Sequence, residues 1–461
     1  MTGEFFEGPT KAGFADVIIG TAFGDEGKGL ETSRRIETGA YNFGVRFNGG
    51  ANAGHERGDI TLNQIPSSIG LVGYNLLANG SLVDPELLLA EVELVKESLG
   101  IQITPDNFGI SDTAHIVMPH HKILDGIRET SSDAQGSTKK GIAFVAADKS
   151  GRRGVRGEYL SWAPDKLSKA ALEGLHLANR ALREAGKNEI EPDVELERWL
   201  AAANMLLPFM VDSIPLLHDA LESGQNVLLE GAQAVGLDMD MGIYPLNTSS
   251  NVGPGGAING TGISHQYIRN VVGVAKLPGS RVGGEDGPFP TRVTDADTAD
   301  RLRGVRGDLD GEYGKVSERP RDLGYPDLAV IRHAVKVAGV TELVLTKLDK
   351  VPLFGGQIKV AVAYDVNGER RDTMPNSALK LAACVPIYET FRNWQADISD
   401  VREFENLPEE AQTLVKFIEG QLGVPVTTLG VGPHAHQVIK RHKDYSQNGN
   451  GSTRSKVRVS A

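Results

Sequence analysis

Residues 19–29 read I-G-T-A-F-G-D-E-G-K-G, and this segment decides the fold. The hydrophobic residues 17–19 predict a strand before it, and the polar residues 31–33 predict the opening of a helix after it. Glycines let backbone N–H groups approach a phosphate, and a helix N-terminus adds a partial positive charge. Lys28 can reach phosphate oxygens as a point charge. The segment therefore predicts a phosphate-binding turn between a strand and a helix.

This turn departs from the standard P-loop, G-x-x-x-x-G-K-[ST]. Ala22 stands where that pattern has its first glycine, and Gly29 stands where it has a hydroxyl residue. Asp25 is the unusual member, because a carboxylate inside a phosphate cradle repels the phosphate unless it binds a metal ion or takes up a proton. Asp25 is therefore a candidate base or metal ligand, and an ordinary strand-to-helix turn is the alternative.

Composition excludes several classes of protein. The chain has 461 residues, of which 40% are hydrophobic and 23% charged, as in soluble globular proteins. A net charge of −12 argues against a general nucleic-acid-binding protein. The single cysteine, Cys384, cannot form an intrachain disulfide or a cysteine-cluster metal site, and it suits the reducing cytoplasm where we expect the protein to act. No apolar run is long enough for a membrane span, and residues 1–14 lack the features of a signal peptide.

The order of elements predicts one large α/β domain over residues 15–441. We expect a mostly parallel central sheet with helices on both faces and long ligand-binding loops, preceded by a flexible lead (1–14) and followed by a disordered tail (442–461). Strands are predicted at 15–20, 42–47, 226–230, 271–277 and 342–346, and helices at 85–99 and 327–338. Residues 161–225 predict a helical subregion. Long loops are predicted at 278–291 and 303–326, and residues 247–262 hold too much Gly, Asn and Ser for regular structure.

Two further polar segments follow predicted strands. Residues 48–55 read N-G-G-A-N-A-G-H, and His55 could donate to a developing oxyanion or to a phosphoryl group in transfer. Residues 346–349 read T-K-L-D, close to the guanine-reading pattern N-K-x-D. The Asp349 carboxylate can accept hydrogen bonds from N1–H and the 2-amino group of guanine, and adenine has neither donor there. Taken alone, each segment also fits an ordinary packed or exposed strand end.

Basic residues form two more candidate sites. Ser137 and Thr138 precede a group that suits a phosphate monoester: Lys139, Lys140, Lys149, Arg152, Arg153 and Arg156. Arg319 and Arg321 flank Pro320 and could grip a substrate carboxylate. A solvated charged surface is the alternative for both groups.

Taken together, these motifs resemble the adenylosuccinate synthetase family over residues 16–440. The motifs are G-D-E-G-K-G (24–29), N-A-G-H (52–55), E-G-A-Q (230–233), Y-P-x-x-T-S-S-N (244–251), R-V-G…G-P-F-P-T (281–291), T-K-L-D (346–349) and P-I-Y-E-T (386–390). Enzymes of that family join L-aspartate to C6 of IMP, driven by GTP and Mg²⁺, in purine nucleotide biosynthesis. The resemblance implies a ligase with these substrates that works as a homodimer.

The resemblance also implies roles for particular residues. Asp25 would take the N1 proton of the purine and bind Mg²⁺ together with the carbonyl of Gly54, and His55 would stabilise the 6-oxygen and the transferred phosphoryl group. GTP would be held by Gly24, Glu26, Gly27, Lys28, Gly29, Lys347, Asp349 and Gly432.

Further roles concern the acceptor nucleotide and aspartate. Asn52, Thr138, Gln233 and Thr248 would hold the purine monophosphate, and Arg152 would reach it from the partner subunit. Arg319 and Arg321 would bind the ribose and the aspartate carboxylate.

Departures from the family pattern leave the substrates open. The acceptor-phosphate loop (136–144), the aspartate loop (316–325), the end of the chain near Gly432 and the position of Glu56 all differ from the usual sequence. One alternative is a phage-type relative that uses dGMP, with ATP or GTP, to make the succino-precursor of 2-aminoadenine for modified DNA. Another is a GTP-binding regulatory protein on an inactive synthetase scaffold, which the presence of Asp25 and His55 disfavours.

Overall fold

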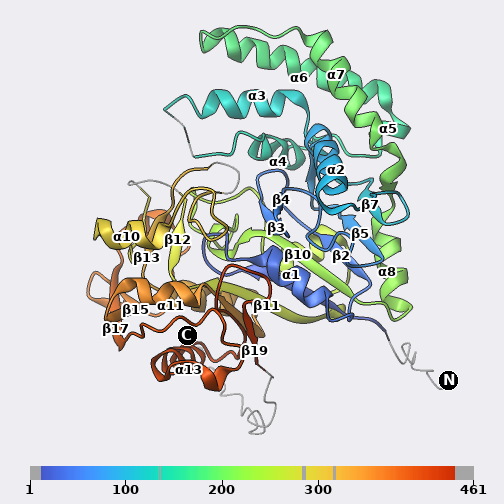
Figure 1. Ribbon diagram of the computed structural model, residues 1–461. Coiled ribbons are helices and arrows are strands. Elements are labelled where there is room, and N and C mark those ends of the chain that lie inside the picture. The colour runs from blue at the N-terminus through green and yellow to red at the C-terminus, as the bar shows by residue number, and fades with distance from the viewer. Residues whose placement is uncertain (1–11, 133, 135, 283–286, 315–317, 442–461) are drawn as a thin grey trace, which may run out of the picture.

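A ten-stranded sheet runs through the centre of the computed structural model, which describes residues 12–132, 134, 136–282, 287–314 and 318–441 (Figure 1). The strand order is β19-β18-β14-β11-β1-β10-β2-β5-β7-β9, with neighbouring strands parallel except at β18 and β19. The strands are β1 (Ala15–Gly20), β2 (Phe43–Arg46), β5 (Tyr74–Leu77), β7 (Phe108–Ser111), β9 (Met210–Val211), β10 (Val227–Ala234), β11 (Ile268–Lys276), β14 (Glu342–Thr346), β18 (Val426–Gly430) and β19 (Val438–Lys440). The predicted mostly parallel sheet is confirmed.

Helices cover both faces of this sheet, as the sequence predicts. Val17 and Ile19 of β1 belong to a core shared with α8 (Ser213–Glu222), α11 (Leu328–Ala338) and α13 (Glu409–Leu422). Ile18 faces the other way and packs in a cluster with Ile36 of α1 (Lys28–Ile36). A strand buried on both faces reads as a continuous apolar run, which is why residues 17–19 identify β1.

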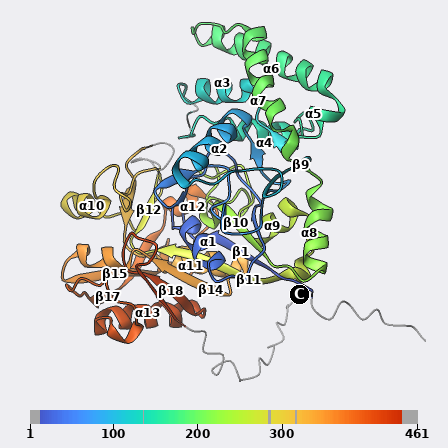
Figure 2. The same cartoon turned by 45° about the vertical axis from the view of Figure 1, so that its right-hand side comes forward.

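A group of helices forms one end of the molecule, opposite α13 in Figures 1 and 2. Its members are α2 (Pro85–Leu99), α3 (Pro119–Arg128), α4 (Ile142–Ser150), α5 (Tyr159–Trp162), α6 (Pro164–Glu184) and α7 (Pro192–Met205). Among them, α2, α5, α6 and α7 share a second core around the fully buried Trp199, whose indole N–H donates to the carbonyl of Val117 at 3.1 Å. α6, α7 and α8 occupy most of the helical subregion predicted at 161–225.

Smaller elements complete the architecture. Three two-stranded pairs are β3 (His55–Arg57) with β4 (Ile60–Leu62), β6 (Leu82–Val83) with β8 (His115–Ile116), and β12 (Gly279–Arg281) with β13 (Asp322–Gly324). A three-stranded sheet contains β16 (Glu369–Arg371), β15 (Gln357–Val366) and β17 (Val385–Arg392). The remaining helices are α9 (Pro254–Thr261), α10 (Ala296–Arg303) and α12 (Ala378–Ala382), with 3₁₀ segments at 207–209, 235–237, 265–267, 348–354 and 404–406.

The prediction that residues 247–262 lack regular structure holds for 247–253 and is wrong for 254–261, which form α9. Pro254 begins α9, where its missing N–H costs nothing, and the helix ends at the left-handed Gly262. The glycine content serves close packing: a Cβ on Gly260 would lie 2.1 Å from the carbonyl oxygen of Phe47, at the end of the neighbouring strand. The glycines therefore allow the buried side of α9 to contact the backbone of Phe47 directly.

Other boundaries also differ from the sequence prediction. α1 begins at Lys28, three residues before the predicted opening, because the left-handed Gly27 turns the chain directly into the helix. β12 and β13 pair across the two predicted loops at 278–291 and 303–326, and three-residue strands leave no periodic pattern in a sequence.

The ends of the chain lie mostly outside the described residues. This applies to the predicted tail (442–461) and to residues 1–11 of the predicted lead. Within that lead, Gly13 donates its N–H to the carbonyl of Leu221 and Phe14 packs edge-on against Tyr41. Across the described ranges, no helix combines the length and the apolar character that crossing a bilayer requires.

Candidate active site

A cleft of about 740 Å³ lies at the carboxyl ends of the central strands. Its walls are the turns that follow β1, β2, β10, β14 and β18, together with the loop before α4 and the loop before β13. After β1 the chain forms β2, β5, β7 and β9 on one side of the sheet. It then returns, so that β10 and β11 lie directly beside β1 on its two sides. Ligands of open α/β sheets bind at such a switch point, outside the carboxyl ends of the strands.

Glu26 shapes the phosphate turn. Its buried carboxylate accepts the N–H groups of Ala22 and Gly24 at 3.1 and 2.9 Å, and it pairs with the Lys28 ammonium at 3.0 Å. This carboxylate is therefore engaged within the turn itself, where the sequence predicts a GTP contact. It holds Lys28 at the cleft wall and fixes the backbone of the glycine-rich turn at the predicted phosphate position.

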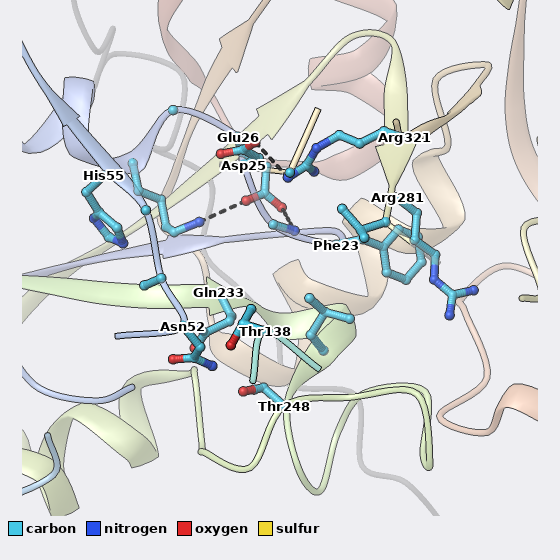
Figure 3. Close-up of a pocket in the computed structure, with 18 of the residues that line it drawn as sticks. Phe23, Asp25, Glu26, Asn52, His55, Thr138, Gln233, Thr248, Arg281 and Arg321 are labelled. Atoms are coloured by element: carbon cyan, nitrogen blue, oxygen red, sulfur yellow. Dashed lines mark hydrogen bonds and ion pairs between the residues drawn. The ribbon is translucent and has the colours of Figure 1, made fainter. Parts of the chain in front are cut away.

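Asp25 lines the cleft in a left-handed backbone conformation, with φ at 59°. Such a conformation costs a non-glycine residue about 1 kcal/mol or more. The carboxylate pairs with the Arg321 guanidinium at 2.7 Å (Figure 3). The sequence predicts different roles for Asp25, at the purine, and Arg321, at the aspartate or ribose. The structure brings the two side chains into contact.

His55 is held from behind by a second carboxylate. Its Nδ1 lies in a short hydrogen bond with Oε1 of Glu230, and Glu230 also accepts the N–H and hydroxyl of Ser67 at 2.8 and 2.7 Å. Gly29 permits this approach, because a Cβ there would lie 3.1 Å from the Cβ of His55. The Glu230 contact occupies Nδ1 of His55 and leaves Nε2 for a ligand.

The protonation of this pair follows from its surroundings. Burial, followed by the charge of Arg46, lowers the pKa of His55 to about 4. Burial by itself raises the pKa of Glu230, but the contact with His55 outweighs it and the pKa falls to about 2. At neutral pH the pair is therefore a neutral imidazole that donates its Nδ1–H to an ionised carboxylate.

Replacing Glu230 with glutamine should lower kcat by roughly 100-fold while KM changes little. Glutamine keeps the shape of the contact but removes the negative charge that would favour protonation of His55 when an anionic ligand faces Nε2. Steady-state kinetics from pH 5 to 9, with thermal unfolding as the control for folding, check this. A folded Glu230→Gln enzyme with kcat within threefold of wild type would show that the carboxylate is unimportant to His55.

The turn after β14 forms the far wall of the cleft. Lys347 is left-handed, and its ammonium reaches Glu312 at 2.5 Å and the carbonyl of Asp310 at 3.0 Å. In the described part of the chain, no hydrogen-bond donor reaches Oδ1 of Asp349, although this atom is buried. Burial raises the pKa of Asp349. An unsatisfied buried carboxylate oxygen at a cleft wall is an acceptor that a ligand can satisfy.

The residues predicted to hold the purine monophosphate lie on one side of the cleft. Figure 3 shows Asn52, Thr138, Gln233 and Thr248 together, across from Asp25. Oε1 of Gln233 is buried without a hydrogen-bond partner among the described residues. Gly432, Gly54 and Arg319 also line the cleft.

Arg152 is the exception, because it does not line the cleft of its own subunit. It lies in the exposed turn just after α4. Of the six basic residues from 139 to 156, all of them within the described ranges, none belongs to the cleft wall of this chain.

Sequence reasoning missed several contributors. Glu230 lies inside the E-G-A-Q motif, but only the structure shows that it faces His55. Arg281 lines the cleft, donates to the carbonyl of Pro288 at 2.8 Å and stands over the ring of Phe23; burial lowers its pKa to about 10. Glu312 has no motif around it that predicts its position.

Oxygen donors at the cleft suit a hard divalent cation. Asp25 offers a carboxylate and Gly54 a carbonyl, both at the cleft wall, and these are the ligand types that Mg²⁺ prefers. Another cluster, His120, His121 and Asp148, fits a metal less well. Nδ1 of His121 accepts the N–H of Met118, so its Nε2 carries the proton and donates to Asp148 at 3.1 Å, which leaves no lone pair there for a metal.

Comparisons with known proteins identify the family of the chain. The sequence model of the adenylosuccinate synthetase family matches residues 17–439. The adenylosuccinate synthetases of Clostridium perfringens and Bifidobacterium longum are 36% and 40% identical over 433 and 434 residues, covering 92% of this chain and 98% of each relative. The fully ligated adenylosuccinate synthetase of Plasmodium falciparum superposes with a TM-score of 0.81 at 31% identity, covering 93% of this chain and all of that one.

A second solved structure shows the same fold at lower similarity. The succinoaminodeoxyadenylate synthetase of cyanophage S-2L, bound to dGMP and dATP, has a TM-score of 0.59 at 20% identity and covers 93% of this chain. The fold and the cleft thus define an α/β ligase that forms a C–N bond. The chain belongs to the adenylosuccinate synthetase family.

Proposed function

We propose that this ligase joins L-aspartate to C6 of IMP, driven by GTP, and so makes adenylosuccinate for AMP biosynthesis. The observation that carries the proposal is the cleft at the carboxyl ends of the strands, whose lining includes Asp25, His55 and Asp349. Oδ1 of Asp349 is buried there without a hydrogen-bond partner among the described residues. We further propose that it acts in a reducing cytoplasm, which its single cysteine suits.

The first step removes a proton and forms a P–O bond. Asp25 accepts the N1 proton of the purine, which places negative charge on the 6-oxygen. That oxygen attacks the γ-phosphorus of GTP, the bond to the β-phosphate oxygen breaks, and GDP leaves. Lys28 and the backbone N–H groups of the turn hold the triphosphate during the transfer.

The second step replaces oxygen with nitrogen. The amine of aspartate attacks C6, its proton passes to solvent or a base, and inorganic phosphate leaves with the original 6-oxygen. Phosphorylation is needed because oxide is a very poor leaving group and phosphate is a good one. Arg321 is released from Asp25 to bind the incoming carboxylate, which exchanges one ion pair for another.

His55 stabilises the charge that moves between these oxygens. With Glu230 behind it and an anionic phosphoryl group in front, the pKa of His55 rises from its low ligand-free value, so that Nε2 donates. Asp25 and the Gly54 carbonyl would hold Mg²⁺, which supplies neutralisation of phosphate charge when bound.

The acceptor dGMP is the second candidate, with ATP or GTP as donor. It differs from IMP by a 2-amino group and by the missing 2′-hydroxyl, so the chemistry at C6 is the same. The altered sequences of the acceptor-phosphate and aspartate loops favour it. Thr346, Lys347 and Asp349 in a guanine-reading order favour GTP as the donor.

One assay tests the proposal. The purified protein is incubated with aspartate, Mg²⁺ and each pairing of IMP or dGMP with GTP or ATP, and phosphate release and product mass are followed. We expect adenylosuccinate from IMP and GTP. A product formed only from dGMP would replace IMP as the acceptor, and no product from any pairing would contradict the proposed function.

We also propose a homodimer in which Arg152 completes the partner's acceptor site, since it stands outside its own cleft. Mixing the inactive variants Asp25→Ala and Arg152→Ala should restore about a quarter of wild-type activity, because half of the dimers are mixed and each holds one intact site. Activity is measured after subunit exchange, with mass spectrometry to confirm mixed dimers. Mixed dimers that stay inactive would contradict the shared site.

A further inference from the structure

We propose that Glu312 is a positioning residue that couples the donor-base site to the amino-acid site. Its carboxylate lies between Lys347, next to the base-reading Asp349, and Arg321, the arginine proposed to bind aspartate. The inference rests on the proposed function for the identity of those two ligands. The contacts themselves are properties of the chain.

The carboxylate of Glu312 is a buried junction. Only 2% of the residue is exposed, and no motif of the sequence points to it. Oε1 accepts from Lys347 at 2.5 Å, and Oε2 accepts from Lys276 at 2.9 Å and from the hydroxyl of Ser280 at 2.6 Å. Nε of Arg321 lies 3.9 Å from the same Oε2.

The backbone fixes Glu312 and Arg321 relative to each other. The N–H of Arg321 donates to the carbonyl of Glu312 at 2.9 Å, and Tyr313 and Pro320 form an antiparallel bridge beside them. The two side chains therefore start from neighbouring points of one narrow loop. A movement of the Arg321 backbone therefore also moves the segment that carries Glu312.

Charge makes the junction responsive. Burial acts to raise the pKa of Glu312, but Lys276, Lys347 and Arg321 outweigh it and hold that pKa well below its usual range. Burial lowers the pKa of Lys276 to about 8 despite the adjacent Glu312. Three cations thus share one carboxylate, so a change in the contact of one cation alters how strongly the carboxylate holds the others.

Each of the two proposed ligands binds next to one partner of Glu312. A guanine bound by Asp349 contacts the turn that carries Lys347, and a substrate carboxylate draws Arg321 away from its 2.7 Å contact with Asp25. Glu312 stays beside Arg321 through their backbone hydrogen bond at 2.9 Å. Binding at one end should therefore favour binding at the other, and the coupling must be equal in both directions.

The experiment measures this coupling without turnover. Calorimetry gives the Kd of GDP in the presence of saturating IMP and Mg²⁺, with and without L-aspartate, for wild type and Glu312→Gln. In wild type we expect aspartate to tighten GDP binding by roughly tenfold. In Glu312→Gln the two values should agree within twofold. The coupling ratio is the readout, because a general loss of stability changes both Kd values alike.

Two further variants make the result decisive. Glu342→Gln removes the charge of another buried glutamate, which pairs with Arg35 at 3.1 Å outside the cleft, and it should keep the wild-type ratio. Glu312→Asp keeps the charge but shortens the reach, so its ratio should fall between the other two, and it serves if Glu312→Gln does not fold. A wild-type ratio in the Glu312 variants, or no coupling in wild type, overturns the proposal. Wild-type protein that binds neither GDP nor aspartate overturns the proposed function and this inference with it.

Discussion

Asp25→Asn should lower kcat by roughly 10³- to 10⁴-fold, the largest loss expected from any single substitution in this protein. Asparagine is isosteric with aspartate but cannot accept the N1 proton, and without that step the 6-oxygen stays a weak nucleophile. It also removes the anion that pairs with Arg321 and that would hold Mg²⁺. Binding of GTP should survive, because Lys28 and Glu26 form the phosphate turn without the Asp25 side chain.

Steady-state kinetics give kcat, and calorimetry with GTP gives the Kd of the inactive variant. Asp295→Asn is the matched control, since Asp295 caps α10 outside the cleft and asparagine is also a good cap. This control should keep wild-type activity. Turnover by Asp25→Asn within tenfold of wild type would remove Asp25 from the role of base.

Asp349→Asn should reduce kcat/KM for GTP by at least about 100-fold, because two charge-assisted hydrogen bonds are lost at about 1.5 kcal/mol or more each. The amide of the introduced asparagine would place a donor against the donors of guanine at a buried position. ATP has no such donors at that edge, so the preference for GTP over ATP should shrink by a similar factor.

Competition between GTP and ATP in one reaction measures that preference directly. Glu342→Gln is again a suitable control for the loss of a buried carboxylate elsewhere. An unchanged preference in a folded Asp349→Asn enzyme would show that guanine is read by other residues. The phage-type alternative would be favoured if wild type prefers ATP to GTP as the donor and Asp349→Asn leaves the rate with ATP unchanged.

The framework was predictable because its signals are local. β1, α2 and β14 have the bounds that the sequence predicts. The polar turns after β1 and β14 converge because parallel strands end at one edge of the sheet. α9 escaped prediction because its glycines serve packing against Phe47, and a single sequence does not show that contact.

The electrostatic part of the site could not be predicted. Glu230 reaches His55 across 175 residues of sequence, and Glu312 joins Lys347 and Lys276 through a loop that looks unstructured in sequence. The partners of a buried charge depend on tertiary geometry, so a motif can predict that Asp25 is unusual but not that Arg321 faces it.

The central claim is that the 6-oxygen of the purine leaves as phosphate. IMP labelled with oxygen-18 at C6 is incubated with GTP, aspartate, Mg²⁺ and the enzyme, and the inorganic phosphate is analysed by mass spectrometry. The account predicts one labelled oxygen in each phosphate formed per adenylosuccinate. Product formation with unlabelled phosphate and labelled water would mean that the oxygen leaves without phosphorylation, which contradicts the proposed roles of Asp25 and His55.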